Sequence, residues 1–102
     1  MTFAPTHTML DAVTAAVVSS TIFPQRRQDE VGKVQFEITG GTATIKVQGR
    51  AHPSAPWATL MTVTEADMGD NDTLYAVIEL TVEMQVDLVN EVGATVSVWI
   101  TE

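Results

Sequence analysis

Apolar and polar residues alternate on both sides of a Gly-Gly pair in residues 34–49, VQFEITGGTATIKVQG. Side chains of a strand point to opposite faces with a period of two, so each arm has one apolar and one polar face. Glycine readily adopts the positive φ that a tight turn needs. The pattern therefore predicts a β-hairpin with Gly40 and Gly41 at its turn.

The same period of two predicts further strands toward the C-terminus, over residues 57–64, 74–80, 84–89 and 95–100. Three rows of these strands are expected to face inward: Ala76, Ile78 and Leu80; Met84, Val86 and Leu88; and Val96, Val98 and Ile100.

The N-terminal third is less regular. Residues 9–20 combine helical spacing with stiff β-branched side chains, and we interpret them as an irregular strand with a bulge at Ala15 and Ala16. Residues 21–23 add a possible short strand before Pro24.

Seven or eight short strands without a convincing helix indicate an all-β protein. The chain is rich in Thr and Val, and only 18% of its residues are charged, which also favours strands. We predict one domain over residues 1–102, folded as an antiparallel β-sandwich with a jelly-roll or Ig-like topology. Residues 1–8 are expected to form a flexible or docking N-terminal arm.

Charge and composition exclude several partners. The net charge of −8 argues against nucleic acid, whose phosphates require a basic surface, and against an anionic membrane. The chain has no run of 18 apolar residues, and residues 10–20 lack a preceding basic residue, so neither a membrane span nor a signal peptide is predicted. The absence of cysteine excludes disulfides and thiolate chemistry and is compatible with cytoplasmic folding.

No motif brings catalytic or metal-binding groups together. His7 and His52 are each placed in a Pro-containing loop, without a partner at the spacing of zinc ligands. No serine lies in a G-x-S-x-G motif. The acidic residues 65–72 could offer oxygen ligands to calcium, but they do not match an EF-hand, and Asp and Asn also form ordinary turns. We expect no enzyme activity, cofactor or metal, and leave calcium at residues 65–72 open.

Two features suggest contacts with other chains. Arg26 and Arg27 lie side by side, which is typical either of a solvated loop or of an interface, where arginine is enriched. Trp99 alternates out of phase with its inward neighbours, so it is predicted to face away from the core. There it could be covered by another segment, form an interface or stack on a sugar. The arm adds Thr6 and Thr8 as candidate contacts.

Four segments of the chain, TMLDAVTA, GGTATIKVQGR, APWATL and GATVSVWI, resemble a group of small structural proteins of tailed bacteriophages. The likeness touches residues 8–64 and 84–100. The chain departs from the group at residues 50–53, where RAHP replaces a Ser-Leu-Asp-Gly turn, so a binding role for this turn is not carried over. The resemblance implies a non-enzymatic β-sandwich protein of the virion and supplies no catalytic residue.

From this resemblance we expect a capsid decoration (cement) protein. It would associate with itself as a trimer, bind the major capsid protein on the capsid surface of the virion, and be made in the host cytoplasm. The alternatives are a tail, neck or fibre component, or a carbohydrate-binding module that stacks sugars on Trp57 or Trp99.

Overall fold

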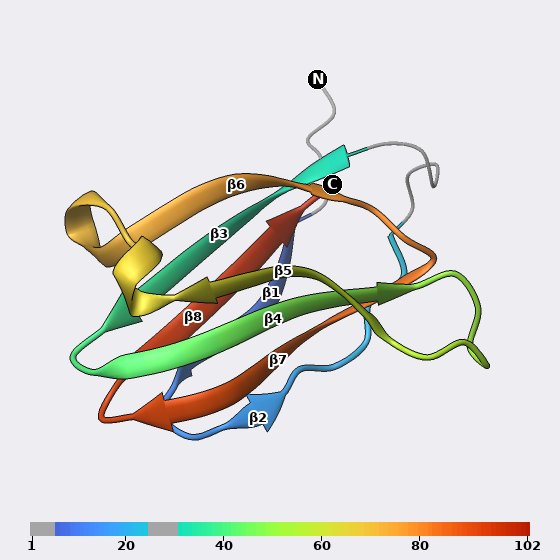
Figure 1. The fold of residues 1–102 in the computed structure, drawn as a ribbon. Helices are drawn as coiled ribbons and strands as arrows, with labels where there is room; N and C mark the ends of the chain where they lie inside the picture. The colour runs from blue at the N-terminus through green and yellow to red at the C-terminus, as the bar shows by residue number, and fades with distance from the viewer. Residues whose placement is uncertain (1–5, 25–30) are drawn as a thin grey trace.

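The computed structural model describes residues 6–24 and 31–102, which form eight strands in two antiparallel sheets packed face to face (Figure 1). Sheet A contains, in spatial order, β1 (Thr6–Val13), β8 (Thr95–Thr101), β3 (Val31–Thr39) and β6 (Thr73–Glu79). Sheet B contains β2 (Val17–Val18), β7 (Glu83–Val92), β4 (Thr42–Arg50) and β5 (Ala58–Thr64). Two 3₁₀ turns, η1 (Glu65–Asp67) and η2 (Asp70–Asp72), connect β5 to β6. The predicted all-β sandwich is confirmed.

The strand order identifies the topology as a jelly roll. β1 pairs with β8, β2 with β7, β3 with β6 and β4 with β5, as in one long hairpin rolled around a core. Two further pairings, β3 with β8 and β4 with β7, complete the sheets. Of the two predicted topologies, the jelly roll is therefore the correct one.

The core lies between the sheets and consists of the inward rows of both. Phe36, Ile45, Met84 and Val98 are fully buried, as is most of each predicted inward row. Ala76 is the exception, because β6 lies at an edge of sheet A and leaves this side chain half-buried. The period of two thus predicted which side chains are buried.

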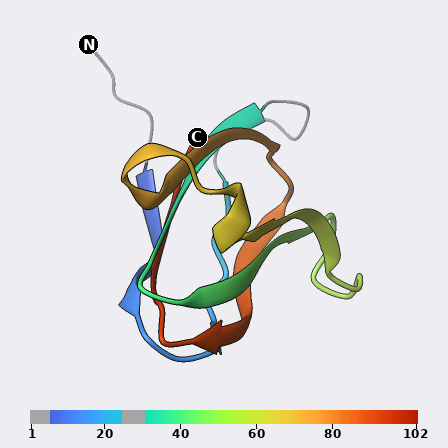
Figure 2. The ribbon, with the colours of Figure 1, turned by 60° about the vertical axis from the view of Figure 1, so that its left-hand side comes forward.

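The predicted hairpin around Gly40 and Gly41 is wrong in its pairing. β3 lies in sheet A and β4 in sheet B, so the two strands face each other across the core as an arch (Figure 2). Gly40 adopts a φ of +92°. Gly41 lies so close to β7 that a Cβ there would be 2.0 Å from the carbonyl oxygen of Val92. The glycines are required by this close passage rather than by a hairpin turn.

The N-terminal predictions also need correction. The predicted arm, residues 1–8, ends in a strand, since β1 begins at Thr6; residues 1–5 lie outside the described residues. Ala15 and Ala16 are not a bulge, because the chain leaves sheet A and enters sheet B there. The irregularities lie inside β1, where Ala12 has a φ of 51°. The possible strand at residues 21–23 is a single bridge from Ile22 to Met84.

Candidate functional site

The outer face of sheet A carries three of the candidate contact residues from the sequence analysis, Thr6, Thr8 and Trp99. Strand register places Thr8, Trp99, Gln35 and Tyr75 in one row across the four strands. The neighbouring row contains Thr6, Thr101, Lys33 and Val77. Paired residues project to the same side of a sheet, so these eight side chains share one surface, which we call the Trp99 face.

Trp99 is half-buried and faces away from the core, because its neighbours Val98 and Ile100 are completely buried on the opposite side. This confirms the predicted orientation. β8 is an inner strand, so Trp99 is flanked by Thr8 of β1 and Gln35 of β3. A half-buried aromatic side chain on the outer face of a sheet is available for contact with another surface.

Both candidate threonines lie on the same face. Thr8 pairs directly with Trp99, and Thr6 pairs with Thr101, with their hydroxyl oxygens 3.3 Å apart. The structure thus brings together three of the five candidate contacts. Arg26 and Arg27 lie outside the described residues.

Tyr75 and Val77 complete the Trp99 face and were missed in the sequence analysis. Their exposed fractions are 62% and 55%. The Lys33 ammonium lies 5.8 Å from the centroid of the Tyr75 ring, within the range of a cation–π contact. Both residues are out of phase with Ala76 and Ile78, so the criterion that identified Trp99 would also have found them.

Trp57, the other tryptophan, packs against Arg50 of the same chain. The Arg50 guanidinium stacks 4.1 Å from the Trp57 ring centroid, and its Nη2 donates to Glu83 Oε1 at 3.0 Å. Glu83 is only 4% exposed, so this ion pair is largely shielded from water. Arg50 therefore fixes the loop between β4 and β5 and occupies one face of the Trp57 ring.

The two histidines serve different local roles. His7 lies in β1 rather than in the predicted loop, and its Nε2 is 2.6 Å from Oε2 of the buried Glu102. This contact joins the start of β1 to the end of the described chain. His52 is exposed in a loop, as predicted, and its Nδ1 accepts a hydrogen bond from the Ser54 amide.

The acidic residues 65–72 form the two 3₁₀ turns, and two of their carboxylates bind backbone amides. Asp67 Oδ2 accepts from the Thr64 amide at 2.8 Å, and Glu65 Oε2 accepts from the Ala43 amide at 3.2 Å. Over residues 6–24 and 31–102, no group of three or more His, Asp or Glu side chains is arranged to hold a metal ion. These acids act as turn-forming residues in this structure.

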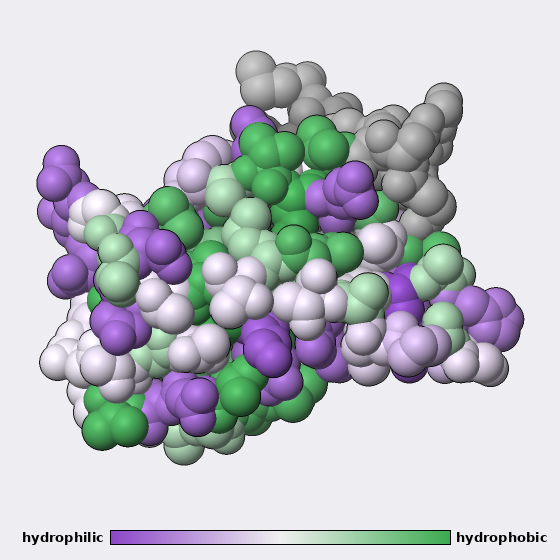
Figure 3. All heavy atoms as spheres, in the orientation of Figure 1, coloured by the Kyte–Doolittle hydropathy of each residue, from purple (hydrophilic) through white to green (hydrophobic). Residues whose placement is uncertain are grey.

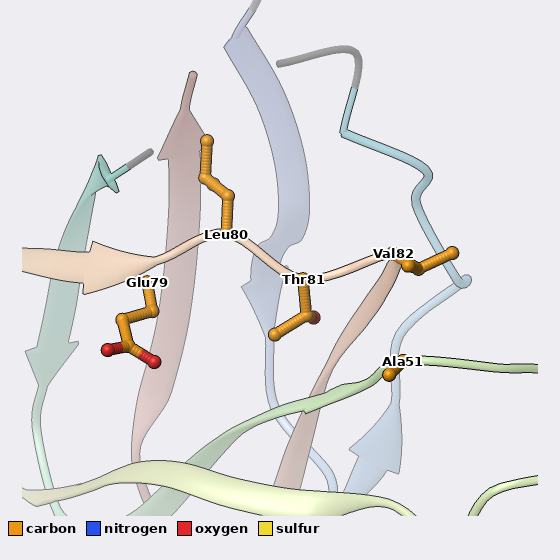
Figure 4. Close-up of a pocket in the computed structure, with 5 residues that line it drawn as sticks. All are labelled: Ala51, Glu79, Leu80, Thr81 and Val82. Carbon is orange, nitrogen blue, oxygen red and sulfur yellow. The ribbon is translucent and has the colours of Figure 1, made fainter. Parts of the chain in front are cut away.

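A pocket of about 210 Å³ lies where β6 passes into β7, beside the end of β4 (Figure 4). Its lining residues are Ala51, Glu79, Leu80, Thr81 and Val82. Glu79 supplies the only carboxylate among them, and the Thr81 hydroxyl donates to the Glu83 carbonyl oxygen at 2.7 Å. The lining therefore pairs no nucleophile with a base.

No helix in the described part of the chain is both long and apolar enough to cross a membrane. No family profile matches the chain, and no curated protein matches it in sequence.

Solved structures with a similar fold include the SPBc2 prophage-derived protein YomS. It aligns with a TM-score of 0.60 over 96% of this chain and 92% of YomS, at 12% sequence identity. Two mutants of the family 29 carbohydrate-binding module CBM29-2 align over 97% of this chain, and over 88% and 89% of their own chains. Their TM-scores are 0.44 and 0.41, each at 9% identity. At these identities the likeness to YomS establishes a shared fold.

Proposed function

We propose that this chain is a non-enzymatic structural protein of a phage virion that decorates the head by binding the major capsid protein. The observation that carries the proposal is the gathering of Thr6, Thr8 and Trp99 with Tyr75 and Val77 on one outer sheet face. The fold shared with a prophage-derived protein supports a phage setting. On this proposal the chain is made in the host cytoplasm and ends on the capsid surface.

The composition of the Trp99 face suits a protein partner. Lys33 is the only charged residue in its two rows, although the whole chain carries thirteen acidic residues. Interface centres are depleted of charge and enriched in aromatic side chains, and Trp and Tyr are frequent among residues that dominate binding energy. Trp99 and Tyr75 supply two such side chains in one row.

Cryo-electron microscopy of particles of the phage that encodes this chain tests the location. We expect a jelly roll at equivalent positions over the head lattice. Density confined to the tail, neck or fibres would instead support the alternative virion role, which differs in copy number and symmetry. Absence of the chain from purified particles would overturn both.

Adding the purified chain to phage particles that lack it tests whether the Trp99 face binds the head. Trp99→Ala should weaken binding to the heads by about tenfold or more, because a half-buried aromatic anchor is lost. The matched control is Val92→Ala, which truncates a side chain that is 71% exposed at the end of β7 in sheet B. Equal binding by the Trp99 variant and the control would contradict the proposed contact.

Carbohydrate binding is a second candidate function, and one observation favours it. Trp99 and Tyr75 lie in the same row with β3 between them, which places them about 10 Å apart at the usual spacing of strands. Sugar rings stack on such exposed aromatic faces. Trp57 is less suited, since Arg50 covers one face of its ring. Glycan-array binding that disappears in a folded Trp99→Ala variant would favour this candidate, and an unchanged signal would count against it.

A further inference from the structure

Among residues 6–24 and 31–102, β6 pairs only with β3, and its other edge is free. We infer that this free edge pairs with β6 of a second copy of this chain, antiparallel and around a two-fold axis at Ala76. The two copies of sheet A would then form one continuous eight-stranded sheet. This inference goes beyond the virion role proposed above and does not depend on it.

The four edge strands differ in how well they are protected. β2 has only two residues, β1 has two register irregularities, and β5 has one. β6 pairs with β3 over seven residues without any irregularity. Natural proteins block sheet edges with short strands, bulges, prolines or charges, so a long regular edge is a ready template for another strand.

The middle of β6 also lacks the usual protective residues. Leu74 to Ile78 reads LYAVI, with no lysine, no proline and no charge. Tyr75 and Val77 are largely exposed, and the inward Leu74 and Ala76 are only half-buried. Figure 3 shows hydrophobic surface gathered along β6 and in the band between β6 and β5.

Backbone directions show which groups are available for pairing. The Thr73 carbonyl oxygen accepts from the Gly69 amide at 2.9 Å, and this contact lies outside the β3–β6 ladder. The Thr73 carbonyl therefore points away from β3. Backbone groups of a strand alternate between its two sides, so those of Tyr75 and Val77 also point to the free edge.

An antiparallel register centred on Ala76 matches this edge to itself. Tyr75 of one copy would lie opposite Val77 of the second copy, and these two residues would exchange both backbone hydrogen bonds on each side of the axis. Aromatic and β-branched side chains are a favourable cross-strand pair. The pairing would end at Leu74 and Ile78, because the Thr73 carbonyl on this edge already accepts from the Gly69 amide. No charged residue lies within the paired segment.

This contact has a defined symmetry. A strand that pairs with its own copy forms an isologous interface, which closes at two chains. A trimer cannot be built through it and would need a different surface. In the dimer the Trp99 faces of both copies lie on the same side of the continuous sheet.

Analytical ultracentrifugation over a concentration series tests the pairing. The native chain should sediment as a dimer that dissociates on dilution, and added salt should strengthen it, because each copy carries a net charge of −8. Val77→Lys should raise the dissociation constant more than about tenfold, since an edge lysine opposes strand pairing. Val18→Lys is the matched control, with an exposed fraction of 50% on the edge strand β2 against 55% for Val77.

Hydrogen exchange on the native chain gives a readout that needs no variant. The amides of Tyr75 and Val77 should exchange fast at low concentration and become protected as the dimer forms. A monomer at every concentration, a trimer, or a dimer that leaves these two amides unprotected would overturn the inference. So would a folded Val77→Lys variant that associates as well as Val18→Lys.

Discussion

Replacing Gly41 with alanine tests the arch between β3 and β4. A Cβ at Gly41 would be 2.0 Å from the Val92 carbonyl oxygen and 2.6 Å from the Gly93 carbonyl carbon, and real Cβ contacts are essentially never below 3.0 Å. The arch and the turn between β7 and β8 would therefore have to separate by about 1 Å. Overpacking costs about 1–3 kcal/mol. Because both colliding groups are backbone, we expect the upper end, about 3 kcal/mol.

Urea denaturation followed by tryptophan fluorescence measures this loss, and thermal unfolding should show a fall in Tm of about 12 °C or more. Gly93→Ala is the matched control. Gly93 has a φ of +67°, but a Cβ added there would have no neighbour within 4 Å, so only backbone strain of about 1 kcal/mol is expected. If the Gly41 variant loses no more stability than the Gly93 variant, the close passage of the arch over β7 is refuted.

Two further predictions concern the buried ion pair and the acidic turns. Glu83→Ala should lower the free energy of unfolding by about 3 kcal/mol, because it leaves the Arg50 guanidinium largely buried without its carboxylate; a loss below about 1 kcal/mol in urea denaturation would contradict this reasoning. Millimolar calcium should leave Tm unchanged, because Glu65 and Asp67 already bind backbone amides. A rise in Tm with calcium that magnesium does not reproduce would show that residues 65–72 form a site.

Strand positions and inward rows were predictable from the sequence, but strand neighbours were not. The alternation of apolar and polar residues indicates which side chains face the core. It does not distinguish a hairpin from an arch, because both bury the apolar faces of residues 34–39 and 42–49. The choice depends on pairing with β6, β7 and β8, which lie far along the chain. No local pattern around Gly40 contains that information.

The candidate site was predictable to a similar degree. The outward position of Trp99 followed from its phase, and the same criterion applies to Tyr75 and Val77. That Thr8 lies beside Trp99 could not be predicted, because it follows from the pairing of the first strand with the last. The stacking of Arg50 on Trp57 likewise depends on how the intervening loop closes.

The rolled order of the strands has a kinetic consequence. β8 lies between β1 and β3, and β7 lies between β2 and β4, so each sheet lacks an inner strand until residues 83–101 have been synthesised. Before then, only the ribbons β3–β6 and β4–β5 can form, and two-stranded ribbons are marginally stable in water. Contacts between segments that lie far apart in the sequence form slowly. For this reason β proteins of this kind fold in about milliseconds to seconds. Folding should therefore wait until β7 and β8 have been synthesised, and a ribosome stalled before β7 would carry a protease-sensitive nascent chain.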